Sequence, residues 1–166
     1  MALPESHLDM VRPGIALYGV YPGDGHESVL ALKPVLSLKS KVVYFKVVKK
    51  GAGVSYGHQW VAPTDTRVVT VPLGYGDGYL RAFSGRADTL IRGHRFPIIG
   101  SICMDQLMVN IGDREAYNGD EVVLIGSQGK DRISVEEISK ASGVSPYEIL
   151  VTLNQRVPRV FLGELP

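Results

Sequence analysis

A tyrosine between glycines is the residue of this sequence best suited to chemistry. Tyr56 lies in the stretch 51–58, Gly-Ala-Gly-Val-Ser-Tyr-Gly-His, directly after a strongly apolar run. Glycine tolerates positive φ and lets other backbone segments come close, so this stretch can hold a phenol in a site. A phenol with a pKa near ~10 is a poor base at neutral pH unless its surroundings shift that pKa. Catalysis by Tyr56 therefore needs a nearby cation; without one, the stretch is a surface turn with a half-buried tyrosine.

Two further stretches carry polar side chains in a glycine-rich or strand-like context. Residues 74–79, Gly-Tyr-Gly-Asp-Gly-Tyr, lack the spacing of the dinucleotide-binding fingerprint and open no long helix, so they fit the rim of a site better than a phosphate loop. Residues 103–106, Cys-Met-Asp-Gln, have no second cysteine or spaced histidine, and a Cys-Met pair usually fills core. The histidines, none at a metal-ligand spacing, are His7, His26, His58 and His94. We therefore expect no metal site.

Length, composition and charge narrow the class of protein. The 166 residues suit one domain, or one domain with an appendage, and 45% hydrophobic residues are enough for a core. A net charge of +1 without a basic stripe gives no reason to expect nucleic-acid binding. The one cysteine, Cys103, excludes an intrachain disulfide and fits a reducing compartment. No apolar run approaches the ~20 residues of a membrane span and no signal-peptide core is present, so we expect a soluble, cytoplasmic protein.

The hydrophobic pattern predicts a mainly β domain. Apolar and polar residues alternate over 35–50 and change register near Tyr44, which indicates a bulge or a strand that passes from a sheet edge to its core. Pro72 places the end of the run 67–73 at a strand terminus or an edge. Further strands are predicted at 89–91, 97–99, 102–111, 121–125 and 156–162, with turns at 92–94, 118–120 and 128–130. Many short strands at this spacing indicate a barrel-like or sandwich-like domain.

Two short helices and a linker complete the pattern. The stretch 134–142 begins with a capping box and is stopped by Gly143. The stretch 145–153 begins with a second capping box and has proline at its first helical position. Residues 22–26 have the composition of a loop, so the domain proper is expected to begin near Leu30.

Taken in order, these motifs closely resemble the C-terminal part of alanine racemase. The matching stretches are Val-Arg-Pro-Gly-Ile-Ala-Leu-Tyr-Gly (11–19), Val-Ser-Tyr-Gly (54–57), Gly-Tyr-Gly-Asp-Gly (74–78), Ile-Cys-Met-Asp-Gln (102–106), Tyr-Glu (147–148) and Arg-Val-Pro-Arg (156–159). The resemblance covers nearly the whole chain. It implies a fold-type III enzyme that uses pyridoxal 5'-phosphate, with an N-terminal α/β barrel and a C-terminal β-domain. It also implies a head-to-tail homodimer whose active sites take residues from both chains, and the interconversion of L-alanine and D-alanine for the bacterial cell wall.

The resemblance assigns a role to each matching residue. Tyr56 would be the catalytic phenol, which serves the active site of the opposite subunit and exchanges the Cα proton on one face. Arg12 would hydrogen-bond the pyridine nitrogen of the cofactor, and a guanidinium that keeps its proton would leave that nitrogen unprotonated and favour two-base racemisation. Substrate would meet the backbone amide of Met104 and the ring of Tyr75. The residues implied near the cofactor phosphate are Gly14, Ile15 and Tyr147.

Departures from the family pattern lead to further expectations. On this resemblance, residues 1–29 are the end of the α/β barrel with a linker, and residues 30–166 are the C-terminal β-domain. The barrel and its cofactor-binding lysine are missing from the sequence, so we expect a fragment of a longer protein that neither binds the cofactor specifically nor racemises alanine by itself. Ser101 stands where the family often carries arginine, so the family pattern does not predict the lining of the outer entry channel at this position. The alternatives are a broad-specificity or serine racemase of the same fold, and a stand-alone β-domain that acts as an interaction module.

Loss of the barrel also predicts how the remaining domain behaves. The face that carries Tyr56, Tyr75 and Met104 should be exposed, because in the family the partner's barrel covers it. The segment before Gly23 should be poorly anchored, because its native neighbours are missing.

Overall fold

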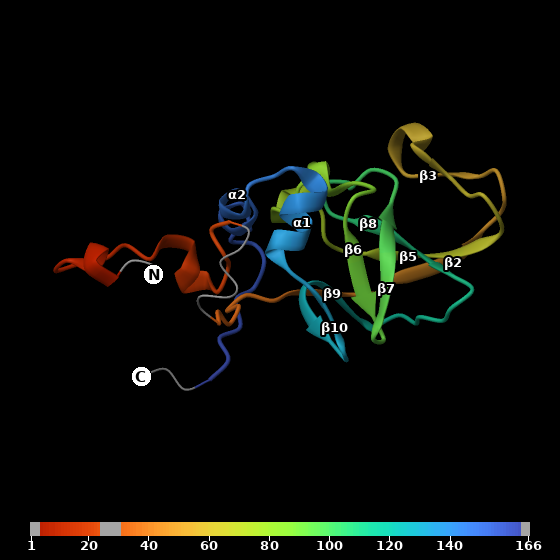
Figure 1. Ribbon diagram of the computed structural model, residues 1–166. Coiled ribbons are helices and arrows are strands. Elements are labelled where there is room, and N and C mark those ends of the chain that lie inside the picture. The colour runs from red at the N-terminus through yellow and green to blue at the C-terminus, as the bar shows by residue number, and fades with distance from the viewer. Residues whose placement is uncertain (1–3, 24–30, 164–166) are drawn as a thin grey trace.

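The structure is a computed structural model that describes residues 4–23 and 31–163 (Figure 1). Its strands pair antiparallel in an eight-stranded sheet of order β1-β9-β6-β7-β8-β5-β2, in which β10 also pairs with β9. These strands are β1 (Leu38–Lys41), β2 (Tyr44–Val48), β5 (Thr66–Val71), β6 (Asp88–Ile91), β7 (His94–Ile99), β8 (Leu107–Gly112), β9 (Glu121–Gln128) and β10 (Asp131–Ile133). A separate two-stranded sheet pairs β3 (Gly53–Val54) with β4 (Trp60–Val61). The expected domain boundary between residues 29 and 30 lies outside the described residues.

The helices are short and lie outside the sheet. The α-helices are α1 (Val135–Ser142) and α2 (Pro146–Val151), which lie beside one end of the sheet (Figure 1). The 3₁₀ helices are η1 (Pro4–His7), η2 (Gly14–Tyr18), η3 (Tyr56–His58), η4 (Tyr75–Asp77) and η5 (Arg81–Phe83). A mainly β domain with two short α-helices is what the sequence pattern predicted.

One bent segment brings the two ends of the sheet together. β1 and β2 stand at opposite ends of the strand order, yet only Val42 and Val43 separate them along the chain. The Val42 N–H donates to the carbonyl oxygen of Asp120 (2.9 Å), next to β9. The Val43 N–H donates to the carbonyl oxygen of Thr70 on β5 (3.0 Å). The sheet therefore curls into a barrel-like shape. The register change near Tyr44 marks this bend, and the predicted passage from an edge to the core is wrong.

The core fills the inside of the curled sheet and continues beneath the helices. Alternate residues of β8 are buried, as expected for a strand with one inward face. β9 is buried continuously over Val122–Ile125, which shows that both of its faces are covered. Ile138 of α1 and Ile149 of α2 belong to the same apolar cluster. The domain thus has its own core, independent of any further chain.

The predicted N-cap and glycine stop of α1 are confirmed, although only one of the two bonds of its capping box is formed, and the ends of α2 are confirmed only partly. The Ser134 hydroxyl accepts a hydrogen bond from the Glu137 N–H (3.1 Å), and Gly143 ends α1 with φ 77°. Ser145 makes no side-chain capping bond, so the second capping box is wrong. Pro146 at the first helical position has no N–H, so the first turn of α2 has one unpaired donor fewer, and its ring sets φ by itself. α2 ends at Val151, before the predicted end at residue 153.

Two predicted strands differ in the structure. The strand expected over 102–111 begins only at Leu107, because the carbonyl oxygens of Cys103 and Met104 accept hydrogen bonds from the loop 74–78 and not from a strand. The strand expected over 156–162 is absent from the described residues. There the Arg159 guanidinium donates to the carbonyl oxygens of residues 153, 154 and 157 and holds the segment in a turn.

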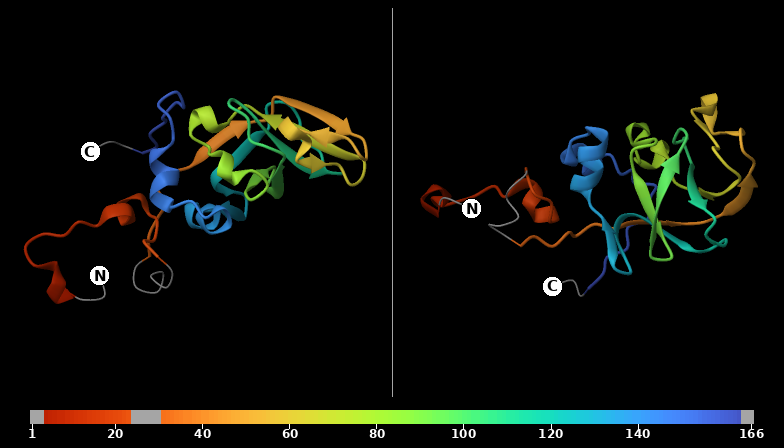
Figure 2. Two further views of the ribbon diagram at one scale, coloured as in Figure 1. Left: turned by 90° about the horizontal axis from the view of Figure 1, so that it is seen from above. Right: turned by 45° about the vertical axis from the view of Figure 1, so that its right-hand side comes forward.

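The N-terminal segment is better anchored than expected. Ile15 and Val20 are buried and belong to the main core cluster. The Val35 N–H donates to the Tyr18 carbonyl oxygen (3.2 Å), and the Tyr21 N–H donates to the Glu136 carboxylate on α1 (3.1 Å). Residues 4–13 do extend away from the domain (Figure 2). The expectation therefore fails for residues 15–21, because burial of apolar side chains, and not only the missing barrel, determines where this segment lies.

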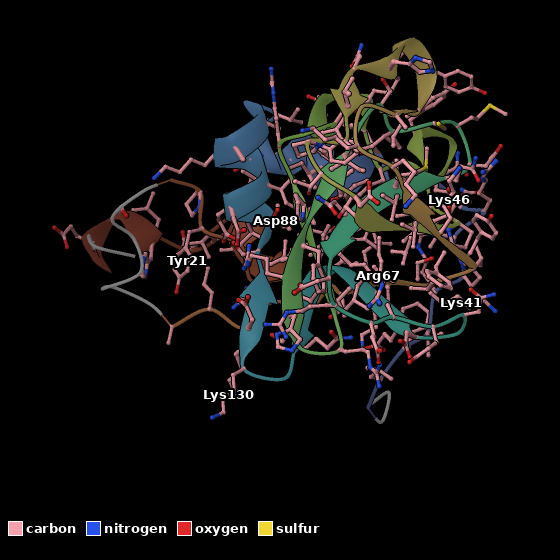
Figure 3. The ribbon with its side chains drawn as sticks, turned by 90° about the vertical axis from the view of Figure 1, so that its right-hand side faces the viewer. Tyr21, Lys41, Lys46, Arg67, Asp88 and Lys130 are labelled. Atoms are coloured by element: carbon pink, nitrogen blue, oxygen red, sulfur yellow. The ribbon has the colours of Figure 1, made fainter. Side chains whose placement is uncertain are left out.

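An arginine on β7 joins three carboxylates. The Arg95 guanidinium lies 3.5 Å from the Asp88 carboxylate on β6 and 3.0 Å from that of Asp131 on β10, and it also pairs with Glu137 on α1. Figure 3 shows Asp88 beside α1. The hydrogen bonds from Arg95 hold the pKa of Asp131 below its usual range. This network ties α1 to the sheet.

This ion-pair network predicts how stability depends on pH. The ordinary pKa of Asp131 is 3.8 and its folded-state pKa is lower, so the ionised carboxylate contributes stability at neutral pH and loses it as the pH falls through the folded-state value. Asp131→Asn should therefore lower stability to urea at neutral pH but flatten the loss of stability below about pH 4. Asp113→Asn, at an exposed carboxylate that pairs with no described residue, is the control. Parallel pH profiles for the wild type and Asp131→Asn would contradict the assignment.

Candidate active-site half

Tyr56 stands on a loop that projects from the domain. It begins η3, in the loop between β3 and β4, away from α1 and α2 (Figure 1). Its side chain is 76% exposed, and no described residue forms a hydrogen bond with its hydroxyl. The cation that a catalytic phenol needs is therefore not supplied by the described part of this chain. A working site at Tyr56 requires a second surface.

Glycines shape the loop around Tyr56 as the sequence indicated. A Cβ at Gly53 would lie 2.5 Å from Cγ of the His58 ring, so this ring can pack there only against glycine. Gly57 has φ 70°, a left-handed value that glycine adopts without strain. The Gly51 N–H donates to the Ala62 carbonyl (2.8 Å) and closes the base of the hairpin. The loop is compact although its tyrosine projects outward.

The loops that carry Tyr75 and Met104 are bonded directly to each other. The Tyr75 N–H donates to the Cys103 carbonyl oxygen (3.0 Å), and the Gly76 N–H donates to the Met104 carbonyl oxygen (2.8 Å). A Cβ at Gly74 would lie 2.2 Å from the Cys103 carbonyl oxygen, so the approach requires glycine. The Tyr75 and Met104 side chains are 43% and 53% exposed. No described residue accepts a hydrogen bond from the Met104 N–H, which leaves this amide available to a ligand.

An arginine near the C-terminus holds both loops. Arg156 Nε donates to Asp77 Oδ1 (2.7 Å), and its Nη2 pairs with the Asp105 carboxylate. The other carboxylate oxygen of Asp77 accepts from the Gly74 N–H (2.8 Å). These charge-assisted bonds fix the loops that carry Tyr75 and Met104 relative to each other. No role was predicted for Arg156, although an arginine in one motif and an aspartate in each of two others were a usable signal.

The remaining predicted site residues lie on other elements. Arg12 and Gly14 are exposed in the N-terminal segment, and Ile15 is buried in the core. Tyr147, in the first turn of α2, is 52% exposed. The N-terminal segment and α2 lie away from the β3-β4 loop in all the ribbon views (Figures 1 and 2). The structure thus does not bring Arg12, Gly14, Ile15 and Tyr147 together with Tyr56 within one chain.

Burial separates the two residues of the Cys103-Met104 pair, and the structure also bears on metal-ligand clusters and membrane-spanning helices. Cys103 is buried as expected, but Met104 is 53% exposed, so the pair does not fill core together. Within residues 4–23 and 31–163, no three histidine, cysteine or acidic side chains are grouped as metal ligands would be. None of the helices in these ranges is long and apolar enough to cross a membrane.

Comparison with known sequences groups the chain with one set of proteins. The family model described as "Alanine racemase, C-terminal domain" matches residues 35–161. The alanine racemase of Carboxydothermus hydrogenoformans is 48% identical over 164 residues, which cover 98% of this chain and 45% of that protein. The alanine racemase of Halothermothrix orenii is 43% identical over 159 residues, which cover 95% of this chain and 42% of that protein. The chain therefore spans less than half the length of these relatives.

Solved structures agree with the sequence comparison. The crystal structure of alanine racemase from D-cycloserine-producing Streptomyces lavendulae matches 98% of this chain and 43% of its own, with a TM-score of 0.92 and 41% identity. The crystal structure of the Bacillus anthracis enzyme with bound L-Ala-P matches 90% of this chain and 39% of its own, with a TM-score of 0.85 and 41% identity. The β-rich fold expected from the sequence is confirmed by these structures.

Proposed function

Because this chain belongs to the alanine racemase family, we propose that it is the part of a pyridoxal 5'-phosphate-dependent racemase that completes the active site of a partner subunit. The reaction is the interconversion of L-alanine and D-alanine by two-base proton transfer. The observation that carries this proposal is Tyr56, an exposed phenol on a constrained loop with no partner among the described residues. Such a group becomes an effective acid or base only when another surface covers it and supplies charge.

The residues assigned to the cofactor fit that group. Among the described residues, none pairs with the Arg12 guanidinium or the Tyr147 hydroxyl, and both side chains are exposed. No atom lies within 4 Å of the place where Gly14 would carry a Cβ, which leaves room for a phosphate. Arg12 would donate a hydrogen bond to the pyridine nitrogen, and the backbone of Gly14 and Ile15 and the Tyr147 hydroxyl would hold the phosphate. The covalent lysine of the family would come from outside these 166 residues.

The residues of this chain would then perform distinct steps. When bound, pyridoxal phosphate withdraws electrons and makes the Cα–H of the amino acid acidic. Tyr56 holds or delivers the proton at Cα on one face, while the Met104 N–H binds the substrate carboxylate. Tyr75 narrows the space beside it and excludes larger side chains. Arg12 keeps its own proton, so the ring nitrogen stays unprotonated and side reactions such as transamination are restrained.

The same proposal sets the biological context. Residues 1–29 are the end of the α/β barrel with a linker, and residues 30–166 are the β-domain. The complete protein is a cytoplasmic homodimer that provides D-alanine for peptidoglycan. Production of D-alanine from L-alanine by the purified full-length protein, with its cofactor bound, tests the activity. Faster racemisation of serine than of alanine would overturn the choice of substrate.

Mixed dimers test whether each site takes residues from two chains. We expect full-length Arg12→Ala and Tyr56→Phe proteins each to be nearly inactive, and a refolded equimolar mixture to recover about a quarter of wild-type activity. The reason is that half of the dimers are mixed, and in each of these one site carries both substitutions and the other carries none.

The control places both substitutions in one chain. Mixed with wild-type protein, the double variant should leave about a quarter of the activity if sites are shared, and about half if they are not. No recovery in the first mixture, together with half the activity in the second, would show that each site lies within one chain.

A further inference from the structure

The residue before Tyr56 has a backbone conformation that serine rarely adopts. Ser55 has φ 66° and ψ 179°, a region that is essentially restricted to glycine. Such a conformation is unfavourable for a residue with a side chain and persists only where the surroundings impose it. Glycine occupies positions 53 and 57 of the same loop, yet position 55 carries a side chain. A serine at this position therefore needs an interaction of its hydroxyl that offsets the backbone strain.

The Ser55 side chain is held by the loop that leads to Met104. Its hydroxyl donates to the Ser101 carbonyl oxygen (2.7 Å) and lies 3.7 Å from the Cys103 sulfur. A Cβ at Gly100 would lie 2.7 Å from the Cβ of Ser55, so Gly100 makes room for this contact. Glycine at position 55 would adopt the same backbone angles without strain, but it would have no atom to reach Ser101.

Ser101 binds the chain on the other side of Tyr56 as well. Its hydroxyl lies 3.4 Å from the Tyr56 carbonyl oxygen and 3.2 Å from the Gln59 side-chain oxygen, and its own side chain is buried. The Ser55 side chain before Tyr56 and the Tyr56 carbonyl oxygen after its Cα therefore both contact Ser101 of the neighbouring loop. Tyr56 projects into solvent from a backbone that is fixed at both ends.

From this arrangement we infer that Ser55 is a positioning residue, whose strained backbone and bond to Ser101 aim the Tyr56 phenol before any partner surface covers it. The inference deepens the proposed function, because it rests on Tyr56 acting as the acid or base at Cα. Orientation that is fixed in advance lowers the barrier of a proton transfer, and a displacement of about 1 Å can cost ~10²-fold in rate. Ser55 does not itself touch the reacting atoms.

Two substitutions in the full-length protein separate positioning from stability. Ser55→Gly removes the hydroxyl and the strain, so thermal stability should be unchanged or higher while kcat falls by about 10- to 100-fold at similar KM. Ser55→Ala removes the hydroxyl but keeps the strain, so both stability and kcat should fall. Ser127→Gly, at an exposed serine on β9, is the control for a serine-to-glycine change and should leave kcat unchanged. Wild-type kcat in Ser55→Gly would overturn the inference.

A double-substitution cycle distinguishes this inference from the proposed function. In the Tyr56→Phe background, Ser55→Gly should have no further effect on kcat if Ser55 acts through the phenol, and additive losses would overturn the inference. Full activity of Tyr56→Phe alone would instead overturn the role of Tyr56. A readout that needs no activity is the ¹⁹F resonance of 3-fluorotyrosine at position 56, assigned by its loss in Tyr56→Phe. We expect one sharp resonance in the wild type and a broadened or shifted one in Ser55→Gly; an unchanged resonance would show that Ser55 does not orient the ring.

Discussion

Replacing Tyr56 by phenylalanine in the full-length protein should reduce alanine racemisation by ~10²–10⁴-fold while the cofactor still binds. The substitution keeps the ring and removes only the hydroxyl, which forms no hydrogen bond with any described residue. Folding should therefore be unaffected, because a hydroxyl without an intramolecular bond contributes little to stability. Initial rates in both directions, together with the cofactor absorbance of each preparation, measure the effect.

Tyr44 provides the matched control for this substitution. It is another exposed tyrosine, 55% accessible, on β2 and outside the loops that carry the predicted site residues. Tyr44→Phe should leave the rate of racemisation unchanged. A rate near that of the wild type for Tyr56→Phe would return Tyr56 to the role of a surface turn residue, and the proposed chemistry would need another acid or base.

Alanine at Gly78 should destabilise the domain more than alanine at any exposed turn glycine. Gly78 has φ +95°, and an added Cβ would lie 2.0 Å from the Thr152 carbonyl oxygen, a backbone atom that cannot move alone. Conformational strain of ~1–2 kcal/mol adds to overpacking of ~1–3 kcal/mol, so we expect a loss of about 3 kcal/mol. For a domain of this size that loss lowers the Tm by about 10 °C, measurable by calorimetry.

Gly85→Ala separates the two contributions. Gly85 has φ +65° and no atom within 4 Å of the position of a Cβ, so alanine there meets strain without a clash. Its expected cost is about 1 kcal/mol, or a few degrees in Tm. Equal effects at both positions would show that contact with Thr152 is unimportant. If the contact matters, Gly78→Ala should also lower the activity of the full-length protein, because the loop that carries Tyr75 packs there against the end of α2.

Much of the fold could be predicted because local patterns determine local structure. The strands over 67–73, 89–91, 97–99 and 121–125 and the first turn of α1 were found from alternation, turn residues and a capping serine. The short strands β3, β4 and β10 were missed, since two or three residues carry no periodic signal. The order of motifs was specific enough to identify the family, which the family model and the solved structures bear out.

The candidate site could be predicted in its residues but not in its geometry. Tyr56, Tyr75 and Met104 were named from their motifs, whereas the contacts that position them join residues distant in sequence. No pattern in the sequence distinguishes Ser55, and its strain is visible only in the backbone angles. Arg156 was part of a motif without a role, and its bonds to Asp77 and Asp105 depend on how three loops meet.

The sequence by itself determined which segments are apolar, where the chain turns, and which polar residues stand beside glycines. These features depend on side chains a few positions apart, so they can be read from one chain. The tertiary structure decided where backbone hydrogen bonds go when two segments compete for them. The carbonyl oxygens of residues 103 and 104 bond to a glycine loop and not to a strand, and Val42 and Val43 join the two ends of the sheet. Such choices depend on segments 27 to 78 residues apart that meet only when the sheet has curled, and no local pattern encodes them.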